Sequence, residues 1–442
     1  MPTRAIARAS WGAALAFGIA SCGARTGLDV QAREDAGADA APAGDVPVDD
    51  APVAPDCGPR PAVGTVRFRV PGVVGRVAIG ADGMIYAPYA TPTRGRGVVA
   101  IDACGQERWR TPAVEPSRGG AILNGEVRLS TGGDVLLTSM LGDIAARGVR
   151  RFGTDGRPRA PYPVDGTVAR FVGLPAGLGP VLVTQAGTTE GRLEGYDLVG
   201  RRLFQQRDWS NVNECAIRGA TVACLDRAFD MARQRVLWTQ PVEILDGTLR
   251  HPLPPAIDGD RIYVAFFGLS SYVLIARDVA TGRVLWRTEL ARSTRGQVDL
   301  LMGAPVVGTG GTVYVYVNVH RSDGGTGQLQ AIRRDGSRAW AFAAPATRTD
   351  YSRFATHVVG DAGVIYLGVG RSVSAVGEDG RLRWMLPMPE GVNASAPALS
   401  PTGDLVVHTD DDQLVVIATE SSGAANTAWP SSNGDSRNAN AR

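Results

Sequence analysis

Few side chains in this sequence have the types and spacing that catalysis or metal binding requires. The acids Asp410–Asp412 could hold calcium, but three acids in a turn are usually solvated. No lysine occurs, which excludes Schiff-base and Ser-Lys mechanisms, and there is no Gly-x-Ser-x-Gly nucleophile elbow. The four histidines stand alone, without the ligand spacing of a zinc site: His251, His320, His357 and His408. We therefore predict no catalytic, cofactor-binding or metal-binding residue.

The five cysteines suit structural chemistry in an oxidising compartment. If Cys22 is set aside for the reason given below, an even set of four remains. Cys215 and Cys224 flank a glycine-centred turn, so we expect them to face each other on adjacent strands as a disulfide. Cys57 would then pair with Cys104 and attach the end of the N-terminal segment to the first repeat. The alternative for each cysteine is a buried free thiol.

Residues 1–21 have the composition of an export signal. Arg4 and Arg8 precede an apolar run that is too short to span a bilayer as a helix. The run ends in Ile19–Cys22 (IASC), which resembles the bacterial lipobox. That resemblance implies a lipid on Cys22, and the glycine that follows implies the outer membrane, on its periplasmic or cell-surface side. The alternative is a plain secretory signal in which Cys22 is incidental.

Residues 22–61 are predicted to be a disordered acidic tether. They are rich in Ala, Asp and Pro and contain no aromatic residue, so they cannot bury enough surface to fold. Eight acids and three arginines lie between residues 23 and 60, and repulsion among the acids extends the segment. The whole chain has a net charge of only +2 and no dense basic stretch, which argues against nucleic-acid binding. Residues 431–442 are predicted to be a disordered tail.

Residues 62–430 contain a unit that recurs every 35 to 55 residues. Each unit has a Gly/Asp turn, an apolar strand that often contains Ile-Tyr or Val-Tyr, a second strand, a Gly turn and a Trp. Apolar and polar residues alternate within it, which is typical of strands. Weaker copies bring the count to eight, although one short interval leaves seven open. The clearest copies are Gly259–Tyr263 with Ala276–Trp286, Gly311–Tyr314 with Ala331–Trp340, and Gly363–Tyr366 with Ala375–Trp384.

Small antiparallel sheets must stack to bury their faces, and radial stacking closes a β-propeller. We therefore predict an all-β propeller of four-stranded antiparallel blades, eight or seven in number. Residues 64–69 are expected to complete the last blade as its outer strand, in competition with Trp429-Pro430. Trp209 lies outside the register and is expected to anchor a loop, or alternatively to line a binding face. The remaining tryptophans of this region are assigned to docking between blades: Trp109, Trp238, Trp286, Trp340, Trp384 and Trp429.

One copy of the unit carries a specific motif, Ala276-x-Asp278-x-x-Thr281-Gly282-x-x-x-Trp286. It resembles the tryptophan-docking motif of the PQQ-like β-propellers, the repeat of quinoprotein alcohol dehydrogenases and of the propeller lipoprotein of the β-barrel assembly machinery. The likeness spans about residues 64 to 430, and eight blades are usual in this family. The other copies keep Gly and Trp but lose Asp or Thr.

The resemblance implies two classes of function. The favoured one is a non-catalytic, lipid-anchored scaffold that binds another envelope or surface protein, with outer-membrane protein assembly as one version. The alternative is a PQQ-dependent dehydrogenase or a small-ligand sensor that uses the central channel. The adjacent cysteines that commonly face the quinone in such dehydrogenases are absent from this sequence. We therefore predict no enzyme activity and no cofactor.

Overall fold

The structure is a computed structural model, and every residue that it describes belongs to the second of two parts of the chain, residues 1–49 and 50–442. The predicted export signal, Cys22 and most of the predicted tether lie outside the described residues, as do Trp429, His251 and His320. The described residues are 57–91, 95–114, 126–138, 149–164, 167–186, 190–207, 209, 215–240, 253–267, 271–292, 300–319, 326–344, 357–427 and 431.

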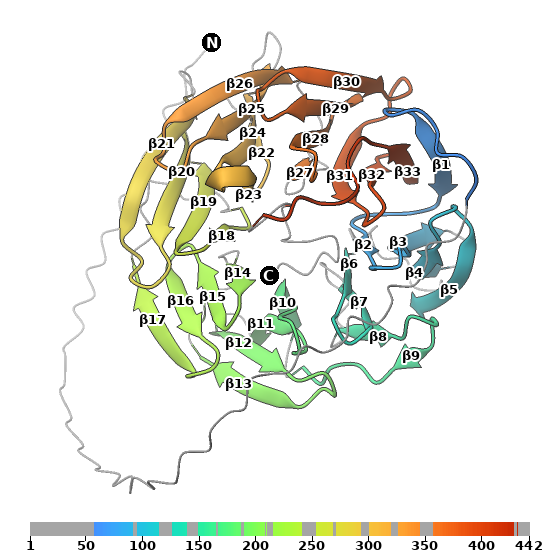
Figure 1. Ribbon diagram of the computed structural model, residues 1–442. Coiled ribbons are helices and arrows are strands. Elements are labelled where there is room, and N and C mark those ends of the chain that lie inside the picture. Colours follow the sequence, from blue (N-terminus) through green and yellow to red (C-terminus); the bar gives the residue numbers. More distant parts are fainter. Residues whose placement is uncertain are drawn as a thin grey trace, which may run out of the picture. The chain divides into compact units, whose positions relative to one another are not determined.

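The described part of the chain is all-β, and its one helical element is the 3-10 turn η1 (Thr309–Gly311). The strands form eight antiparallel sheets, arranged as the blades of a ring (Figure 1). In each blade the first strand lies nearest the centre of the ring and the fourth lies at the rim. The predicted β-propeller is confirmed, and it has eight blades rather than seven.

Blades 1 to 4 follow one another along the chain. Blade 1 contains β2 (Ala78–Ile79), β3 (Ile85–Thr91), β4 (Gly95–Ile101) and β5 (Glu107–Val114). Blade 2 contains β6 (Glu126–Leu129), β7 (Val135–Thr138), β8 (Arg150–Phe152) and β9 (Pro158–Arg159). Blade 3 contains β10 (Thr167–Gly173), β11 (Val181–Ala186), β12 (Glu190–Tyr196) and β13 (Arg202–Gln206). Blade 4 contains β14 (Cys215–Arg218), β15 (Thr221–Cys224), β16 (Arg227–Asp230) and β17 (Arg235–Thr239).

Blades 5 to 7 continue in the same order, and the inner strand of blade 6 is split into two segments that both pair with β24. Blade 5 contains β18 (Ala256–Asp258), β19 (Arg261–Phe267), β20 (Ser271–Asp278) and β21 (Val284–Arg292). Blade 6 contains β22 (Leu300–Met302), β23 (Val306–Val307), β24 (Val313–Val319), β25 (Thr326–Ile332) and β26 (Arg338–Ala344). Blade 7 contains β27 (His357–Val359), β28 (Val364–Val369), β29 (Ser372–Gly377) and β30 (Leu382–Pro387).

Blade 8 joins the two ends of the chain. It contains β31 (Ala394–Leu399), β32 (Asp404–Thr409) and β33 (Gln413–Ala418), and its rim strand is β1 (Val66–Pro71). Strand β1 pairs antiparallel with β33, in a register that runs from Val66 opposite Ile417 to Pro71 opposite Gln413. The expectation that residues 64–69 complete the last blade is therefore confirmed.

The recurring Ile-Tyr or Val-Tyr pair marks the second strand of a blade. Tyr86, Tyr263, Tyr314 and Tyr366 are all fully buried, and the strands around them are rich in Val and Ile. Residues of these types pack well on a pleated sheet, and their apolar faces provide the core between adjacent blades. Each tyrosine ring has its centroid 5.8 to 6.0 Å from that of a rim-strand tryptophan.

After β33 the chain returns along the inner strands of blades 7 and 6. This C-terminal segment, residues 421–427 with Ser431, thus adds to the inner edge of blade 7, and the ribbon crosses towards β23 in Figure 1. Such an edge offers unpaired backbone groups, which the segment partly satisfies. Its contacts are the antiparallel bridges Gly360–Ala424 and Val358–Ser431 and a hydrogen bond of 2.6 Å from Thr427 Oγ1 to Val307 O.

The antiparallel strand order separates the connections between strands into two faces. The turns that join first to second and third to fourth strands lie together on one face, which we call the turn face. These turns are short, whereas connections on the opposite face, such as those from β5 to β6 and from β26 to β27, are longer. Among the described residues no helix is long and apolar enough to cross a membrane.

Candidate functional site

The most regular set of side chains is a series of aromatic residues that docks six of the eight blades on the next, which we call the docking ring. Each aromatic residue comes from a rim strand and covers a glycine of the following blade. The five tryptophans in this ring are five of the six assigned to docking from the sequence. They are Trp109 on Gly156, Trp238 on Gly282, Trp286 on Gly336, Trp340 on Gly380 and Trp384 on Gly64.

Trp286 shows how the docking geometry is built. It lies opposite Ala276 on the neighbouring strand, and this small side chain leaves room for the indole. The indole Nε1 donates a 2.8 Å hydrogen bond to the carbonyl oxygen of Arg334 in blade 6. The indole also covers Gly336, where a Cβ atom would lie only 2.8 Å from the ring and where φ is +90°. Both facts require glycine, which explains why the tryptophan of one unit meets a turn glycine in the next.

The aspartate and threonine of the motif shape the turn that carries Gly282, and Trp238 of blade 4 covers this turn. Thr281 donates hydrogen bonds from its backbone N (2.8 Å) and from Oγ1 (2.7 Å) to Asp278 Oδ1. The bond from the Thr281 hydroxyl holds the pKa of Asp278 below its usual range. In blade 6, Ser337 donates hydrogen bonds from its backbone N (2.9 Å) and from Oγ (2.6 Å) to Asp335 Oδ1, two residues before it. These residues therefore form turns, and their carboxylates are engaged in that task.

Phe68 holds the docking position of the last blade, which sequence reasoning assigned to Trp429. Its ring lies on Gly105 of blade 1, where a Cβ atom would come within 2.7 Å of Phe68 Cδ2. Phe68 belongs to β1, so the residue that docks blade 8 comes from the start of the propeller and not from its end. The signal was available in the pairing of residues 64–69 with the last blade, because a rim strand carries the docking residue.

Two blade interfaces use other contacts in place of tryptophan. Arg151 of blade 2 forms an ion pair with Asp134 (2.7 Å) and donates to the carbonyl oxygen of Leu198 in blade 3 (2.7 Å). Between blades 3 and 4, the rings of Phe204 and Phe229 lie 5.3 Å apart. These are the units in which the repeat is weakest in the sequence.

Trp209 is a packed anchor, as expected from its position outside the register. Its side chain is only 2% exposed, and its ring meets that of Phe229 edge-on at 6.2 Å. The guanidinium of Arg227 lies over the indole at 5.3 Å. A residue with this burial offers no ring face to a ligand, so the alternative of a binding face is wrong.

Both expected disulfides are present. Cys215 and Cys224 lie directly opposite each other on β14 and β15 and are bonded. Cys57 is bonded to Cys104, which lies in the turn between β4 and β5. This second bond fixes the first described residue of the chain to the turn face of blade 1.

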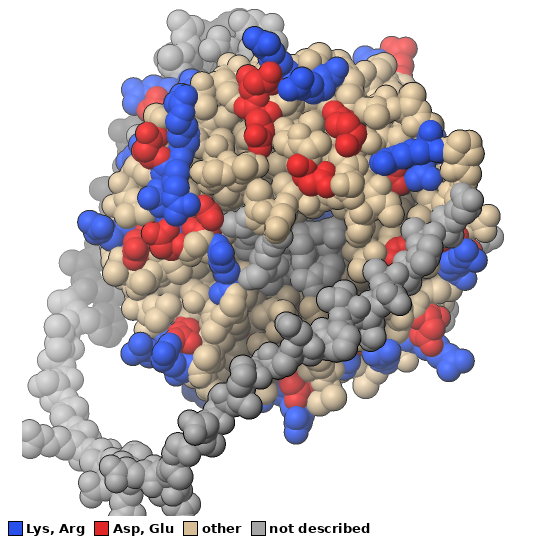
Figure 2. Space-filling view, viewed as in Figure 1, with Lys and Arg blue, Asp and Glu red and all other residues tan. Residues whose placement is uncertain are grey.

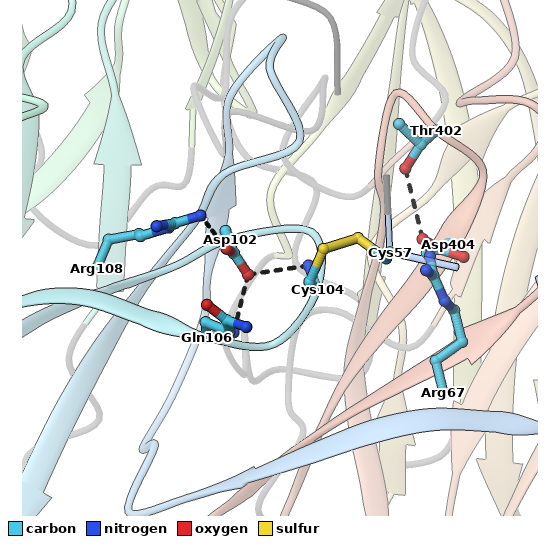
Figure 3. Close-up of a disulfide and its surroundings, with 8 residues drawn as sticks. All are labelled: Cys57, Arg67, Asp102, Cys104, Gln106, Arg108, Thr402 and Asp404. Atoms are coloured by element: carbon cyan, nitrogen blue, oxygen red, sulfur yellow. Dashed lines mark hydrogen bonds and ion pairs between the residues drawn. A yellow bond between two sulfur atoms is a disulfide. The ribbon is translucent and has the colours of Figure 1, made fainter. Parts of the chain in front are cut away.

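The surroundings of the Cys57–Cys104 disulfide are braced by Asp102 (Figure 3). Asp102 Oδ1 accepts hydrogen bonds from the backbone N of Cys104 (2.9 Å) and of Gln106 (2.8 Å). Its other oxygen, Oδ2, lies 2.7 Å from the guanidinium of Arg108. The turn that carries the disulfide is therefore rigidly shaped.

A second carboxylate, Asp404, lies on the blade 8 side of the same region (Figure 3). It forms an ion pair with Arg67 of β1 and accepts a hydrogen bond from Thr402 Oγ1 at 3.4 Å. Its side chain is 5% exposed and that of Arg67 is 14% exposed, so this pair is shielded from solvent. The N-terminal part of the chain is thereby held by blade 1 and by blade 8.

The described histidines are structural. His357 is buried, its Nε2 lies 3.0 Å from the carbonyl oxygen of Tyr314, and burial lowers its pKa to about 4. His408 Nε2 lies 3.2 Å from the carbonyl oxygen of Val73, and burial lowers its pKa as well. A proton on His357 would be strongly disfavoured near neutral pH, so this ring acts as a neutral packing element.

The acids Asp410–Asp412 serve the turn between β32 and β33. Asp410 accepts hydrogen bonds from the backbone N (2.8 Å) and Nδ2 (2.6 Å) of Asn393. Asp411 accepts a 2.6 Å bond from Gln413 Nε2. Within the described ranges, no three His, Cys, Asp or Glu side chains are grouped so that they could hold a metal ion.

A pocket of about 620 Å³ lies on the turn face between blades 6 and 7. Its walls include Tyr314, Arg333, Trp340 and Glu378. The indole Nε1 of Trp340 already donates to the carbonyl oxygen of Glu378 at 2.7 Å, because Trp340 belongs to the docking ring. The lining carries charges of both signs and selects no particular ligand.

The charged side chains are interspersed rather than segregated. On the face seen in Figure 2, acidic and basic side chains alternate around the ring without forming a continuous surface of one sign. Many are paired locally, as Arg334 is with Asp258 (2.7 Å) and with Asp260 (2.9 Å). This face therefore lacks the continuous basic surface that is typical of nucleic-acid binders.

The chain is similar to known propellers in sequence and in structure. A family model described as outer membrane protein assembly factor BamB matches residues 218–441, which is half of the chain. No curated protein matches the chain by sequence. The solved Dos1 propeller is 10% identical with a TM-score of 0.53, and the match covers 80% of this chain and 95% of that one. A europium-containing methanol dehydrogenase is 12% identical with a TM-score of 0.50, covering 78% and 84%. At these identities the structural likeness shows the fold alone.

Proposed function

The chain belongs to the family of outer membrane protein assembly factor BamB, and from this membership we propose that it is a non-catalytic scaffold of the bacterial envelope. In this proposal a lipid on Cys22 holds the propeller at the outer membrane through the acidic tether. The propeller binds another envelope or surface protein, and its contribution is to outer-membrane protein assembly. Neither a cofactor nor a nucleic acid takes part.

The proposal rests on one observation: the residues of the repeated motif contact other parts of the propeller. The aromatic residues of the docking ring and the aspartates of its turns are engaged in blade packing and turn formation. What remains for a partner is the rim, where the outer edge of each fourth strand offers backbone N–H and C=O groups. Strand β30 also exposes two large apolar side chains, Leu382 (44%) and Met385 (46%). A rim of this kind suits an extended strand of another protein, which would add to the blade.

Site-specific crosslinking in cells tests this proposal. A photoreactive amino acid replaces Met385 on β30 or, as the control, the exposed Asp379 on the turn before it. We expect the Met385 position to crosslink to a component of the machinery that assembles outer-membrane β-barrels, identified by mass spectrometry. Equal crosslinking from both positions, or none to that machinery, would count against the assembly role.

The quinoprotein alternative has a direct test of its own. Purified protein is mixed with PQQ and calcium, and absorbance and alcohol-dependent dye reduction are followed. We expect no saturable PQQ binding and no turnover, because no residue has been identified that could orient a quinone or accept a proton beside it. Stoichiometric PQQ binding with alcohol-dependent turnover would replace the scaffold proposal by an enzyme.

A further inference from the structure

The N-terminal segment enters the ring at blade 8, the blade whose strands come from both ends of the propeller. Strand β1 is the rim strand of blade 8, but the chain continues from it directly into blade 1. Blade 8 is therefore completed by strand pairing between β1 and β33, and no loop joins these two strands directly. Any tension on the N-terminal segment that reached β1 would act on this pairing.

The contacts directly ahead of β1 are non-covalent: the Trp384 indole packs on Gly64, and a few hydrogen bonds accompany it. Arg60 Nη2 donates a 2.9 Å hydrogen bond to the carbonyl oxygen of Gly403 and lies 3.5 Å from Asp404 Oδ1, but the Arg60 side chain is 43% exposed. Gly64 N donates to the carbonyl oxygen of Ala418 at 2.8 Å. Exposed ion pairs and single hydrogen bonds are individually weak. These contacts position the segment but would yield one after another under load.

The disulfide provides a second route from the N-terminal segment into the ring. Cys57 precedes all of these contacts along the chain, and its partner Cys104 lies in the Asp102-braced turn of blade 1. Phe68 docks on Gly105, the residue next to Cys104, so the bond enters blade 1 where blade 8 is seated on it. Force applied before Cys57 therefore passes through a covalent bond into blade 1.

We propose that the Cys57–Cys104 disulfide is a mechanical clasp, which directs tension on the N-terminal segment into blade 1 and keeps it off the closing strand β1. A covalent bond carries far more load than strand hydrogen bonds, so residues 58–103 stay relaxed while the clasp is closed. The inference rests on the proposed function in one respect: in the cell, the lipid anchor on Cys22 would be the source of the tension.

Pulling single molecules in an optical trap tests the clasp. One handle is attached to a labelling tag inserted at residue 40 of the full chain, and the other to an azide-bearing amino acid in place of the exposed Ala280 in blade 5. The Cys57→Ser/Cys104→Ser variant is compared with Cys215→Ser/Cys224→Ser, which keeps the clasp and loses the other disulfide. We expect only the first to show an early low-force step, which releases residues 57–71, about 50 Å of extended chain.

A second measurement, in which a reductant opens the disulfide, covers the case in which the Cys57→Ser/Cys104→Ser variant does not fold. The reductant is added to folded Cys215→Ser/Cys224→Ser protein already held in the trap, and the early step should then appear. An early step while the clasp is closed, or its absence after the clasp is opened, would overturn the proposal. Because the trap applies the force, the result does not depend on whether Cys22 carries a lipid.

Discussion

The indole of Trp286 connects two blades by packing on Gly336 and by a hydrogen bond to Arg334. We predict that Trp286→Ala lowers the free energy of unfolding by about 3 kcal/mol, since it removes a large packed ring and leaves the carbonyl oxygen of Arg334 without that donor. Urea unfolding followed by circular dichroism measures the change. Leu382→Ala, at a side chain 44% exposed, is the control and should cost less than about 0.5 kcal/mol. Unchanged stability with lost partner binding would reassign Trp286 from packing to recognition.

His357 predicts a pH dependence of stability. Its pKa is about 4 in the folded protein and 6.5 in the unfolded chain, so the unfolded state binds more protons between these values. Stability is therefore full above pH 6.5 and is lost as the pH falls towards 4, by up to about 3 kcal/mol from this group. Thermal unfolding from pH 7 to 4 measures the trend. His357→Gln should flatten it, and an equally steep profile in that variant would assign the dependence to other groups.

At the scale of elements, β1 depends on Phe68 for its contact with blade 1. We predict that Phe68→Ala lowers the thermal midpoint and speeds hydrogen exchange in β1 and β33, because the closing strand loses its docking side chain. Arg69→Ala, at an exposed position of the same strand, is the matched control and should leave both measurements close to those of the natural chain. Equal effects of the two variants would show that docking by Phe68 does not hold the strand.

The elements were predictable where the repeat is regular and less so where the chain departs from it. The spacing of Gly and Trp predicted the propeller, the number of blades to within one, and the turns that precede the docking strands. Phe68 escaped notice because a single Phe in an alternating strand looks like any buried aromatic residue. The pairing of Ala424 and Ser431 with the inner edge of blade 7 was also missed, since these bridges are made by backbone groups that carry no side-chain signature.

At the scale of the whole molecule, attachment to the membrane depends on one residue. We predict that Cys22→Ala moves the protein from the membrane fraction to the soluble fraction, because no other anchor has been proposed. Fractionation of cells at high salt, with mass spectrometry of the mature N-terminus, measures the change. Sedimentation of the variant with membranes, together with the absence of lipid mass on Cys22 in the natural chain, would remove the anchor from the proposed function.

The pairing of β1 with β33 also sets the order in which the molecule can be completed. Ribosomes make β1 at the beginning of the propeller and β33 near its end, so β1 waits without its partner while seven blades are synthesised. An unpaired strand of this kind invites pairing with the wrong chain. Arg67 and Arg69 flank Phe68 in β1, and charges beside an apolar residue discourage such aggregation. The same arginine that later pairs with Asp404 thus protects the strand before its partner exists.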